Sequence, residues 1–505
     1  MGLGVLESSQ LVVPGTIQLY DNDIGNEDQS HLKHTVDGKT ILAPQPSDSP
    51  NDPLNWSTLK KDSSYLILLT DCVLSGTHAA ILSPVTVELA TEFNVTITAI
   101  AQLTSYMLLM IACFSYLNAP FANIFGKRPV FLFGLILMMC SDIWACKSQS
   151  YGSLLGARIL AGAGESSFST LAIAVVADIY FVHQRSRRIL LFVLCSTSGA
   201  YLGTVIGNQI IYISSWRSAF MGLAIAEGIM LVVTFLFFHE TQYKRVHIDP
   251  LAHMAEEVIL EKINDPTLHM EKTHPSDIEQ VQPVGTLEHV NTAAEEPKNT
   301  FLQNLKVYNG RLSHNNFFLL LYRVLVLNFH PTIFYAACFT ILYSWDVGVS
   351  FTIAAFMTLP PYNFSTAAVG NMFLAPWLGV LLAVIIGEPI LNYGLKWLTR
   401  RNGNVYEPEF RLYGSIPGVI LGIIGCVGWG WGEQDTISWV GLEFFNGIMA
   451  AGATIMNATG AGYIIDAHRE YANESQIILF SLRVCSHQDI VDCNSASLAT
   501  AWDSF

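Results

Sequence analysis

Charged side chains are scarce in this chain of 505 residues, since Asp, Glu, Lys and Arg make up only 13% of it while hydrophobic residues make up 51%. A soluble domain usually carries about 25% charged residues, so this chain cannot cover a surface that faces only water. A bilayer core about 30 Å thick needs roughly 20 apolar residues per helix. The apolar runs are long and continuous rather than alternating, which favours helices over a barrel. We therefore expect an all-α polytopic membrane protein.

Several chemical signatures are missing as well. The nine cysteines stand mostly singly without metal or disulfide spacing, and the 14 histidines are scattered, so no metal site is expected and a membrane enzyme is the least favoured function. The net charge of −15 gathers in the N-terminal tail and in residues 240–300, and no basic stripe suggests nucleic acid. No Gly-x4-Gly-Lys-Ser/Thr loop predicts ATP binding, so we expect no cofactor. The polar first 60 residues contain no cleaved signal peptide.

About ten apolar stretches are present, six before a polar break and four after it. The expected spans are 64–90, 97–118, 129–147, 152–177, 189–211, 219–238, 317–344, 366–391, 412–432 and 436–465. They divide the chain into an N-terminal tail (1–62), a six-helix half (63–239), a linker (240–315), a four-helix half (316–466) and a non-spanning tail (467–505). The linker has no apolar period apart from one surface helix expected near 250–264.

The positions of Lys and Arg predict the orientation, because cytoplasmic loops carry an excess of them. Lys127, Arg128 and Arg185 belong to connections on one side, together with the central linker and the segment 396–411. The N-terminal tail, the linker and the C-terminal tail are therefore expected in the cytosol. Asn94-Val-Thr and Asn363-Phe-Ser then lie outside as glycosylation acceptors.

Ionisable residues inside a span are costly and mark functional sites by default. The candidates are Asp71, Arg158, Glu165, Glu227, Arg323, Glu388 and Glu443. Asp71 is a candidate proton carrier, and Arg158 and Glu165 stand seven residues apart, two turns along one helical face. The alternative for each is a fixed ion pair between helices or a side chain that reaches the membrane surface, and we favour it for the last four residues.

Gly199, Gly203 and Gly207 form a smooth face along the fifth span. Small residues at this spacing let two membrane helices approach closely. The face predicts either ordinary helix packing or a moving seal between the two halves, and the spacing alone does not separate these interpretations.

The plan of six spans, a loop and four spans resembles the major facilitator superfamily. The loop Ala119-Pro-Phe-Ala-Asn123-Ile-Phe-Gly126-Lys127-Arg128 is similar to that family's Gly-x3-Asp-x2-Gly-Arg-Lys signature, with Ala119 and Asn123 as departures. Arg158-Ile-Leu-Ala-Gly162 matches the helix-four motif, whose Arg the resemblance implicates in proton coupling. The fifth-span glycines resemble the antiporter motif Gly-x3-Gly-Pro-x2-Gly, with Thr204 in place of Pro, which removes the bend that Pro implies.

Further strings resemble the fungal drug:proton antiporter group. They are Asp52-Pro-Leu-Asn-Trp56, Asp178 with Arg185, Ser215-Trp-Arg-Ser-Ala-Phe220, His239-Glu-Thr241 and Tyr406-Glu-Pro-Glu-Phe-Arg-Leu412. The resemblance covers most of residues 52–480. It implies export of drugs, toxins or fungal secondary metabolites, although some relatives import polyamines or other solutes.

The resemblance also implies twelve helices, and the sequence supplies about ten. After Asp466 only residues 476–482 are apolar, so helices eleven and twelve are expected to be missing. We suspect that the coding frame is lost near Arg483, through a retained intron or a wrong gene structure. Sequencing of the spliced transcript tests this, and we expect poor folding and weak transport if the truncation is real.

The favoured function is a secondary active transporter that exports a small organic molecule across the plasma membrane, with the vacuolar membrane as the alternative location. Its expected partners are the substrate, protons and the lipid bilayer, without an obligate protein partner. The competing interpretations are an importer of polyamines or other small solutes, and a receptor that kept the fold and lost transport.

Overall fold

The computed structural model describes most of the two expected halves. The described residues are 17–18, 33, 42, 44–243, 298–300, 303, 305–308, 310–311, 316–327, 349, 353, 356–358, 361–403, 405–467 and 477, without the side chains of His183, Ser186 and Glu388. Most of the linker, the segment after residue 327 in the seventh predicted span, and almost all of the tail lie outside them. The predictions of a surface helix near 250–264 and of a broken frame near Arg483 therefore also lie outside the described residues.

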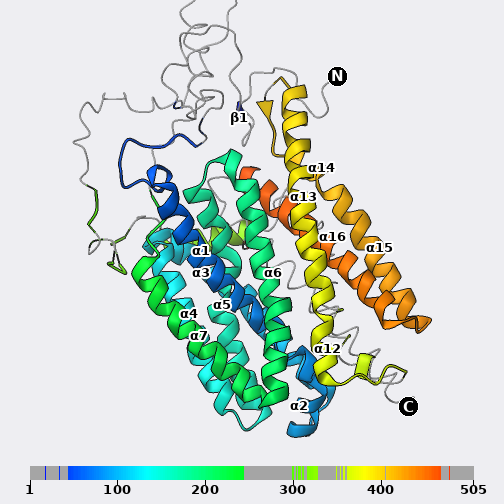
Figure 1. Cartoon of the computed structure of the whole chain (residues 1–505). Helices are drawn as coiled ribbons and strands as arrows, with labels where there is room; N and C mark the ends of the chain where they lie inside the picture. The colour runs from blue at the N-terminus through cyan, green and yellow to red at the C-terminus, as the bar shows by residue number, and fades with distance from the viewer. Residues whose placement is uncertain are drawn as a thin grey trace, which may run out of the picture.

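The N-terminal half is a bundle of long helices that run back and forth (Figure 1). Its elements are η2 (Pro53–Asn55), α1 (Thr58–Ala80), η3 (Ser83–Val85), α2 (Thr86–Phe93), α3 (Ile97–Phe125), α4 (Lys127–Lys147), α5 (Tyr151–Ile179), α6 (Val182–Ile213) and α7 (Trp216–Phe237). Side-chain caps begin several of them, since Thr96, Ser150 and Ser215 accept N–H groups in the first turns of α3, α5 and α7.

The C-terminal half continues the same pattern. Its described elements are α10 (Phe317–Leu327), α12 (Thr366–Met372), α13 (Leu374–Arg401), α14 (Phe410–Tyr413), α15 (Ser415–Gln434) and α16 (Trp439–Ala467). A two-residue strand before the first half, β1 (Ile17–Gln18), pairs antiparallel with β2 (Val405–Tyr406). In Figure 1, β1 and α14 lie at the upper end of the molecule, and α2 and α12 lie at the lower end.

Within the described residues, nine helices are long and apolar enough to cross a membrane. They correspond to nine of the ten predicted spans, and the tenth, expected over 317–344, is described only at its beginning as α10. The first span is one apolar unit of 36 residues, Thr58–Phe93, that η3 interrupts. Pro84 lies at this break and has no backbone N–H to continue the helical ladder. The prediction of an all-α polytopic membrane protein is confirmed.

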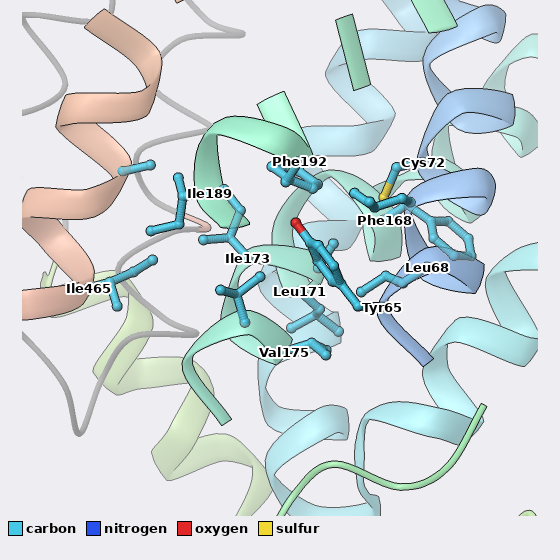
Figure 2. Packing of buried hydrophobic residues seen from close by; sticks show 14 of the residues in the cluster. Tyr65, Leu68, Cys72, Phe168, Leu171, Ile173, Val175, Ile189, Phe192 and Ile465 are labelled. Carbon is cyan, nitrogen blue, oxygen red and sulfur yellow. The ribbon is translucent and has the colours of Figure 1, made fainter. Parts of the chain in front are cut away.

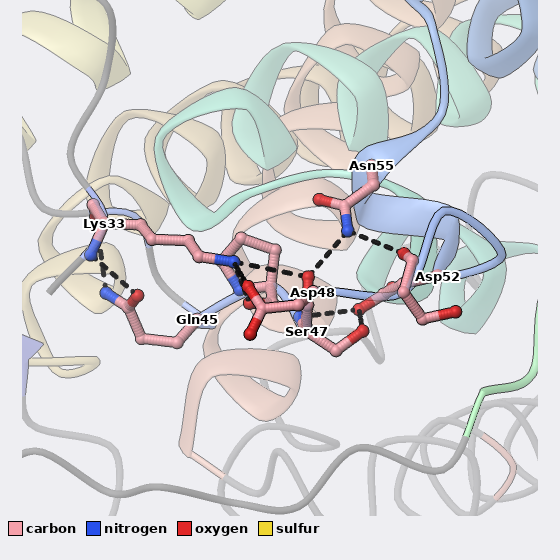
Figure 3. Close-up of polar contacts among 8 residues, drawn as sticks. Lys33, Gln45, Ser47, Asp48, Asp52 and Asn55 are labelled. Atoms are coloured by element: carbon pink, nitrogen blue, oxygen red, sulfur yellow. Dashed lines mark hydrogen bonds and ion pairs between the residues drawn. The ribbon is translucent and has the colours of Figure 1, made fainter. Parts of the chain in front are cut away.

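The turn before α1 contains the motif Asp52-Pro-Leu-Asn-Trp56, and its hydrogen bonds explain why Asp and Asn stand in it. The carboxylate of Asp52 accepts N–H groups from Ser47 and Leu54, each at 3.0 Å, and is buried (Figure 3). The amide nitrogen of Asn55 donates to the main-chain oxygens of Ser47 and Ser49. Asp52 and Asn55 therefore fold the chain that leads into the first span.

The largest apolar cluster joins both halves near the upper end of the molecule. It contains residues of α1, α5 and α6, such as Tyr65, Ile173 and Ile189, together with Ile464 and Ile465 of α16. Figure 2 shows Ile465 pointing towards Ile189 and Ile173. The apolar contact of α16 with the first half therefore joins the two halves at this end.

Candidate functional site

One group of six ionisable side chains lies buried between the helices of the N-terminal half, apart from the buried cations at the helix ends. They are Asp71 and His78 on α1, Asp142 on α4, Arg158 and Glu165 on α5, and Glu227 on α7, and each is 5% exposed or less. Burial of charge in an apolar interior is costly unless partners or protons compensate it. Two of the three predicted transport residues, Arg158 and Glu165, come from one helix, and the third, Asp71, lies on α1 and interacts with Thr234 and Glu227 of α7.

His78 is the centre of this group. Its Nε2 lies 2.7 Å from Oε1 of Glu227, and its Nδ1 lies 3.5 Å from Oδ1 of Asp142. The three side chains are 0–1% exposed. The imidazole therefore bridges two carboxyl groups from two other helices, α4 and α7.

Arg158 contacts the same residue through the main chain. Its Nη2 donates to the carbonyl oxygen of His78 at 2.6 Å. Since α1 ends at Ala80, this carbonyl lies in the last turn, where oxygens lose their partners within the helix. The guanidinium thus fixes α1 just before η3 interrupts the span.

Asp71 and Glu165 complete the group. The hydroxyl of Thr234 on α7 donates to Oδ2 of Asp71 at 2.9 Å. Glu165 interacts electrostatically with Arg158, but in the described part of the chain no ion pair or hydrogen bond joins the two side chains. This agrees with the expectation that two turns of helix keep them apart.

Sequence reasoning did not single out His78 or Asp142, and it favoured a fixed role for Glu227. The rule that found Asp71 would also have found Asp142, which stands in the predicted span 129–147. Spacing along the chain predicted no metal site, but the fold brings ligand atoms of His78, Asp142 and Glu227 within 4.8 Å of one another. Three separate helices supply them, so no local pattern shows the group.

The signature loop between α3 and α4 forms a compact turn. Gly126 has φ +97°, and the carboxylate of Glu240 occupies the place that a Cβ would take. Glu240 accepts the N–H groups of Lys127 at 3.0 Å and Arg128 at 3.1 Å, in the first turn of α4. A carboxylate stabilises a helix N-terminus in this position. Burial raises the pKa of Glu240 above its ordinary value, and these backbone hydrogen bonds oppose the shift.

The predicted gating charges have separate partners. Lys127 Nζ lies 2.6 Å from Oδ2 of Asp178, at the end of α5. Arg128 donates to the main-chain oxygens of Phe235 and Lys306. Asn123, which replaces the family's Asp, accepts a hydrogen bond at its main-chain oxygen from Gln242.

Arg185 donates to the main-chain oxygens of Ala177 and Tyr180 at the end of α5, and it also approaches the other half. Its Nη1 lies 3.9 Å from Oδ1 of Asp466 at the end of α16. Asp466 also pairs with Arg411 and accepts the hydroxyl of Tyr406. Burial raises the pKa of Tyr406. The charged string Asp178…Arg185 therefore contributes one residue to each of two different ion-pair networks.

The predicted glycine face is present, and it packs against α1 inside the N-terminal half. A Cβ at Gly199 would overlap the carbonyl oxygen of Val73, and one at Gly203 would overlap Thr77. Gly207 faces Ile81. The interpretation as a seal between the halves does not describe this arrangement, because the contacts of α6 with the second half come from other faces of the helix. A moving α1–α6 interface stays a prediction.

Two further motif residues have structural roles. Gly162 lets α5 approach the main chain of Met107 on α3. Thr204, which stands where the antiporter motif has Pro, is buried and donates to the main-chain oxygen of Ala200 at 2.5 Å. α6 is continuous through this position, since a hydroxyl does not remove the helical N–H.

At the lower end the halves meet through polar contacts. Nδ2 of Asn208 donates to the main-chain oxygens of Thr366 and Ala367, and Gln209 bonds to Asn371 at 2.9 Å. The hydroxyl of Thr366 donates to Glu88 at 2.8 Å.

The remaining predicted residues lie apart from the cluster. Glu443 of α16 is buried and accepts a hydrogen bond from Asn446. Arg323 lies on α10, and the side chain of Glu388 is outside the described residues. Asn94 and Asn363 are both exposed with positive φ, next to α2 and α12, so they share the lower end.

These features define a multi-pass helical membrane protein with two halves and an ionisable group inside the first of them. The chain belongs to the Major Facilitator Superfamily, whose sequence model matches residues 72–482. It is a transporter of this family.

Two relatives and one solved structure illustrate the similarity. The chain is 24% identical to an MFS-type transporter of Schizosaccharomyces pombe, covering 92% of this chain and 83% of the relative. It is 25% identical to the probable efflux pump mfs2 of Aspergillus flavus, covering 78% and 85%. The fold resembles that of the proton:xylose symporter XylE, with a TM-score of 0.57 at 15% identity, covering 88% of this chain and 90% of the symporter.

Proposed function

We propose that this transporter exports a small organic molecule across the plasma membrane and that inward proton flow drives the export. The substrate would bind between the two halves, which expose it to alternate sides. The similarity to an efflux pump supports export. Secondary metabolites, toxins or drugs are the substrate class that this similarity suggests.

The observation that carries proton coupling is the imbalance of buried charge. The buried group of the first half contains four carboxyl groups, those of Asp71, Asp142, Glu165 and Glu227, and one guanidinium, that of Arg158. Ionised carboxylates at such depth are costly without a positive charge beside them. Exchangeable protons supply that charge, so Asp71 and Glu165 are the proposed carriers and Arg158 is their coupling partner.

The end networks would control access to the binding site. The pair Lys127–Asp178, the cap of Glu240 on α4 and the contact Arg185–Asp466 lie at the end where Figure 1 shows α14. We propose that this end faces the cytosol, because the basic connections gather there. Asn94 and Asn363 would then face outside and accept glycans.

Export is tested in a yeast strain that lacks its own efflux pumps, with the full chain expressed as a tagged protein. Ethidium, a fluorescent organic cation, serves as the probe, and its retention is measured with and without an uncoupler that collapses the proton gradient. We expect at least threefold lower retention than in cells without the protein, and loss of this difference with the uncoupler.

Two results would contradict the proposal. Increased ethidium uptake would favour the importer interpretation, and a screen with polyamines would follow from it. Unchanged retention of ethidium and of a panel of neutral and anionic dyes, with folded protein at the cell surface, would favour a chain that lost transport.

A further inference from the structure

We propose that His78, Asp142 and Glu227 form a further proton-binding site inside the N-terminal half, in addition to the proposed carriers Asp71 and Glu165, and that transport driven by a proton gradient requires the proton of this site. The inference rests on the proposed function of proton-coupled export. It adds three residues from α1, α4 and α7 that no family motif in this chain contains.

The two contacts of the imidazole determine how many protons the site holds. A neutral imidazole has one N–H donor and one acceptor nitrogen. Nε2 is at hydrogen-bond distance from Glu227, 2.7 Å, whereas Nδ1 lies 3.5 Å from Asp142 and has no hydrogen bond. A neutral ring bonds to both carboxyl groups only when one of them is protonated and the distance between Nδ1 and Asp142 shortens. An imidazolium satisfies both ionised carboxylates. Either arrangement contains one proton more than a neutral ring between two carboxylates.

This proton count also balances the neighbouring charge. With one added proton, the group of His78, Asp142 and Glu227 carries a net charge of −1, which the guanidinium of Arg158 offsets when Asp71 and Glu165 are also protonated. Loss of that proton leaves a net negative charge among side chains that are at most 1% exposed. An uncompensated buried charge is strongly destabilising. Deprotonation therefore favours a conformation in which water or another cation reaches the site.

Unsatisfied polar atoms point into the same space. Among the described residues, Nδ1 of His78, Oδ2 of Asp142, Oε2 of Glu227 and Nε and Nη1 of Arg158 are buried without a hydrogen-bond partner. Arg158 interacts electrostatically with Asp142 and Glu165. The site thus contains hydrogen-bond donors and acceptors without partners, and a change in protonation can alter which of them bond to each other.

The surrounding helices contribute few other charges. Asp71 on α1 and Glu165 on α5 are the remaining ionisable groups of the cluster. α3 contains no charged residue or histidine, and those of α6 stand in its first two turns, at the end of the molecule with Asp466. His78 is therefore the basic side chain that faces these carboxyl groups together with Arg158.

The position of the site connects protonation to helix geometry. His78 lies in the last turn of α1, directly before the break at Ser83–Val85. Its side chain contacts α4 and α7 while its carbonyl oxygen accepts from α5. A change of charge at the ring therefore acts on four helices at the point where the first span is interrupted.

A divalent metal ion is the competing occupant, since one histidine and two carboxylates suit such ions. The geometry favours a proton, because the two carboxyl groups approach opposite nitrogens of one ring. One ligand atom of each side chain lies within 4.8 Å of the other two, so the test includes metal binding as an outcome.

The test uses the purified full chain and the same chain in proteoliposomes, with Glu227→Gln and Asp142→Asn as the variants. Glu227→Asp keeps a titratable group, and Glu443→Gln is the matched control, because Glu443 is also buried but lies in α16. All variants are first compared by gel filtration. Ethidium movement is measured under an imposed pH gradient and, without a gradient, as equilibrium exchange.

We expect Glu227→Gln and Asp142→Asn to lower gradient-driven accumulation at least tenfold while exchange stays within twofold of the wild type. Glu227→Asp should restore part of the accumulation, and Glu443→Gln should leave it unchanged. If both neutral variants still accumulate ethidium as the wild type does, the inference is wrong although the proposed function stands.

A second measurement does not depend on transport. Infrared spectroscopy distinguishes a protonated carboxyl group from a carboxylate, and we expect a pH-dependent carboxylic acid band that both neutral variants alter. If this band is present but the wild type moves no ethidium, the proposed function fails and the proton site stands. Stoichiometric binding of Zn²⁺ or Mn²⁺ to the wild type that His78→Gln abolishes would show a metal site and overturn the inference.

Discussion

Arg411 on α14 and Asp466 at the end of α16 form a buried ion pair, in which Nε of Arg411 lies 2.7 Å from Oδ2 of Asp466. The hydroxyl of Tyr406 donates to the same oxygen at 2.6 Å. Arg185 of the first half approaches the other oxygen at 3.9 Å. One carboxylate therefore holds the end of the second half together and connects it to the first.

We expect Asp466→Asn to destabilise the protein strongly, because it leaves the Arg411 guanidinium buried without its counter-charge. Removal of one partner of a buried pair costs about 3–5 kcal/mol. The measurement is the thermal unfolding midpoint of the detergent-purified chain. Asp48→Asn is the control, since Asp48 pairs with Lys33 at 2.7 Å but is 94% exposed, and exposed pairs contribute about 0–1 kcal/mol. Equal effects of the two variants would show that the pair at Asp466 is not structurally important.

Gly126→Ala should destabilise the signature turn through two effects. The residue has φ +97°, and the new methyl group would overlap the carboxylate of Glu240. With ψ +166° as well, this backbone conformation is nearly confined to glycine and costs another residue roughly 1–3 kcal/mol. Displacement of Glu240 also removes its hydrogen bonds to the first turn of α4.

Gly310→Ala separates these effects, because Gly310 has φ +90° and open space around it. Thermal unfolding should show a clearly larger loss for Gly126→Ala. A similar loss for both variants would mean that backbone strain alone matters and that the contact with Glu240 contributes little.

The close approach of α1 and α6 predicts the effect of filling the glycine face. At Gly199 an added methyl group would meet the main chain of Val73, whereas at Gly222 on α7 nothing lies within 4 Å. Alanine is favoured over glycine inside a helix by about 1 kcal/mol, so Gly222→Ala should be neutral or stabilising. Gly199→Ala should instead lower the unfolding midpoint and the monodisperse fraction in gel filtration. An unchanged profile for Gly199→Ala would contradict the observed packing.

We expect His239 to make the protein less stable as the pH falls. Burial, then the positive charges of Lys60 and Arg128, lower the pKa of His239 from 6.5 to about 4. The folded chain therefore binds fewer protons than the unfolded chain between these values, so the contribution of His239 to stability is lost as pH falls from about 6.5 towards 4.

The measurement is the unfolding midpoint between pH 7 and pH 4.5 for the wild type and for His239→Phe, which keeps an aromatic ring beside Trp56. We expect the midpoint of the variant to fall less steeply with acid. Identical slopes would mean that other groups account for the acid sensitivity.

Much of the site was visible in the sequence as separate residues. Asp71, Arg158 and Glu165 stood out because charge inside an apolar run is costly, and the structure places all three in one buried group. Lys127 and Asp178 were named for different motifs, and their 2.6 Å contact depends on the packing of α4 against α5.

Apolar run length decides the number and the approximate bounds of the spans, because a bilayer requires about 20 apolar residues for each crossing. Proline alone does not decide where a span is interrupted, because Pro84 lies at the break after α1 whereas Pro120 and Pro389 lie inside the continuous helices α3 and α13. Only the packing of α1, α4, α5 and α7 decides that His78 stands between Asp142 and Glu227, residues 64 and 149 positions further along the chain. It also decides that the glycines of α6 face α1. Helical periodicity assigns a residue to a face of its own helix, but the contacts between helices determine which partner that face meets.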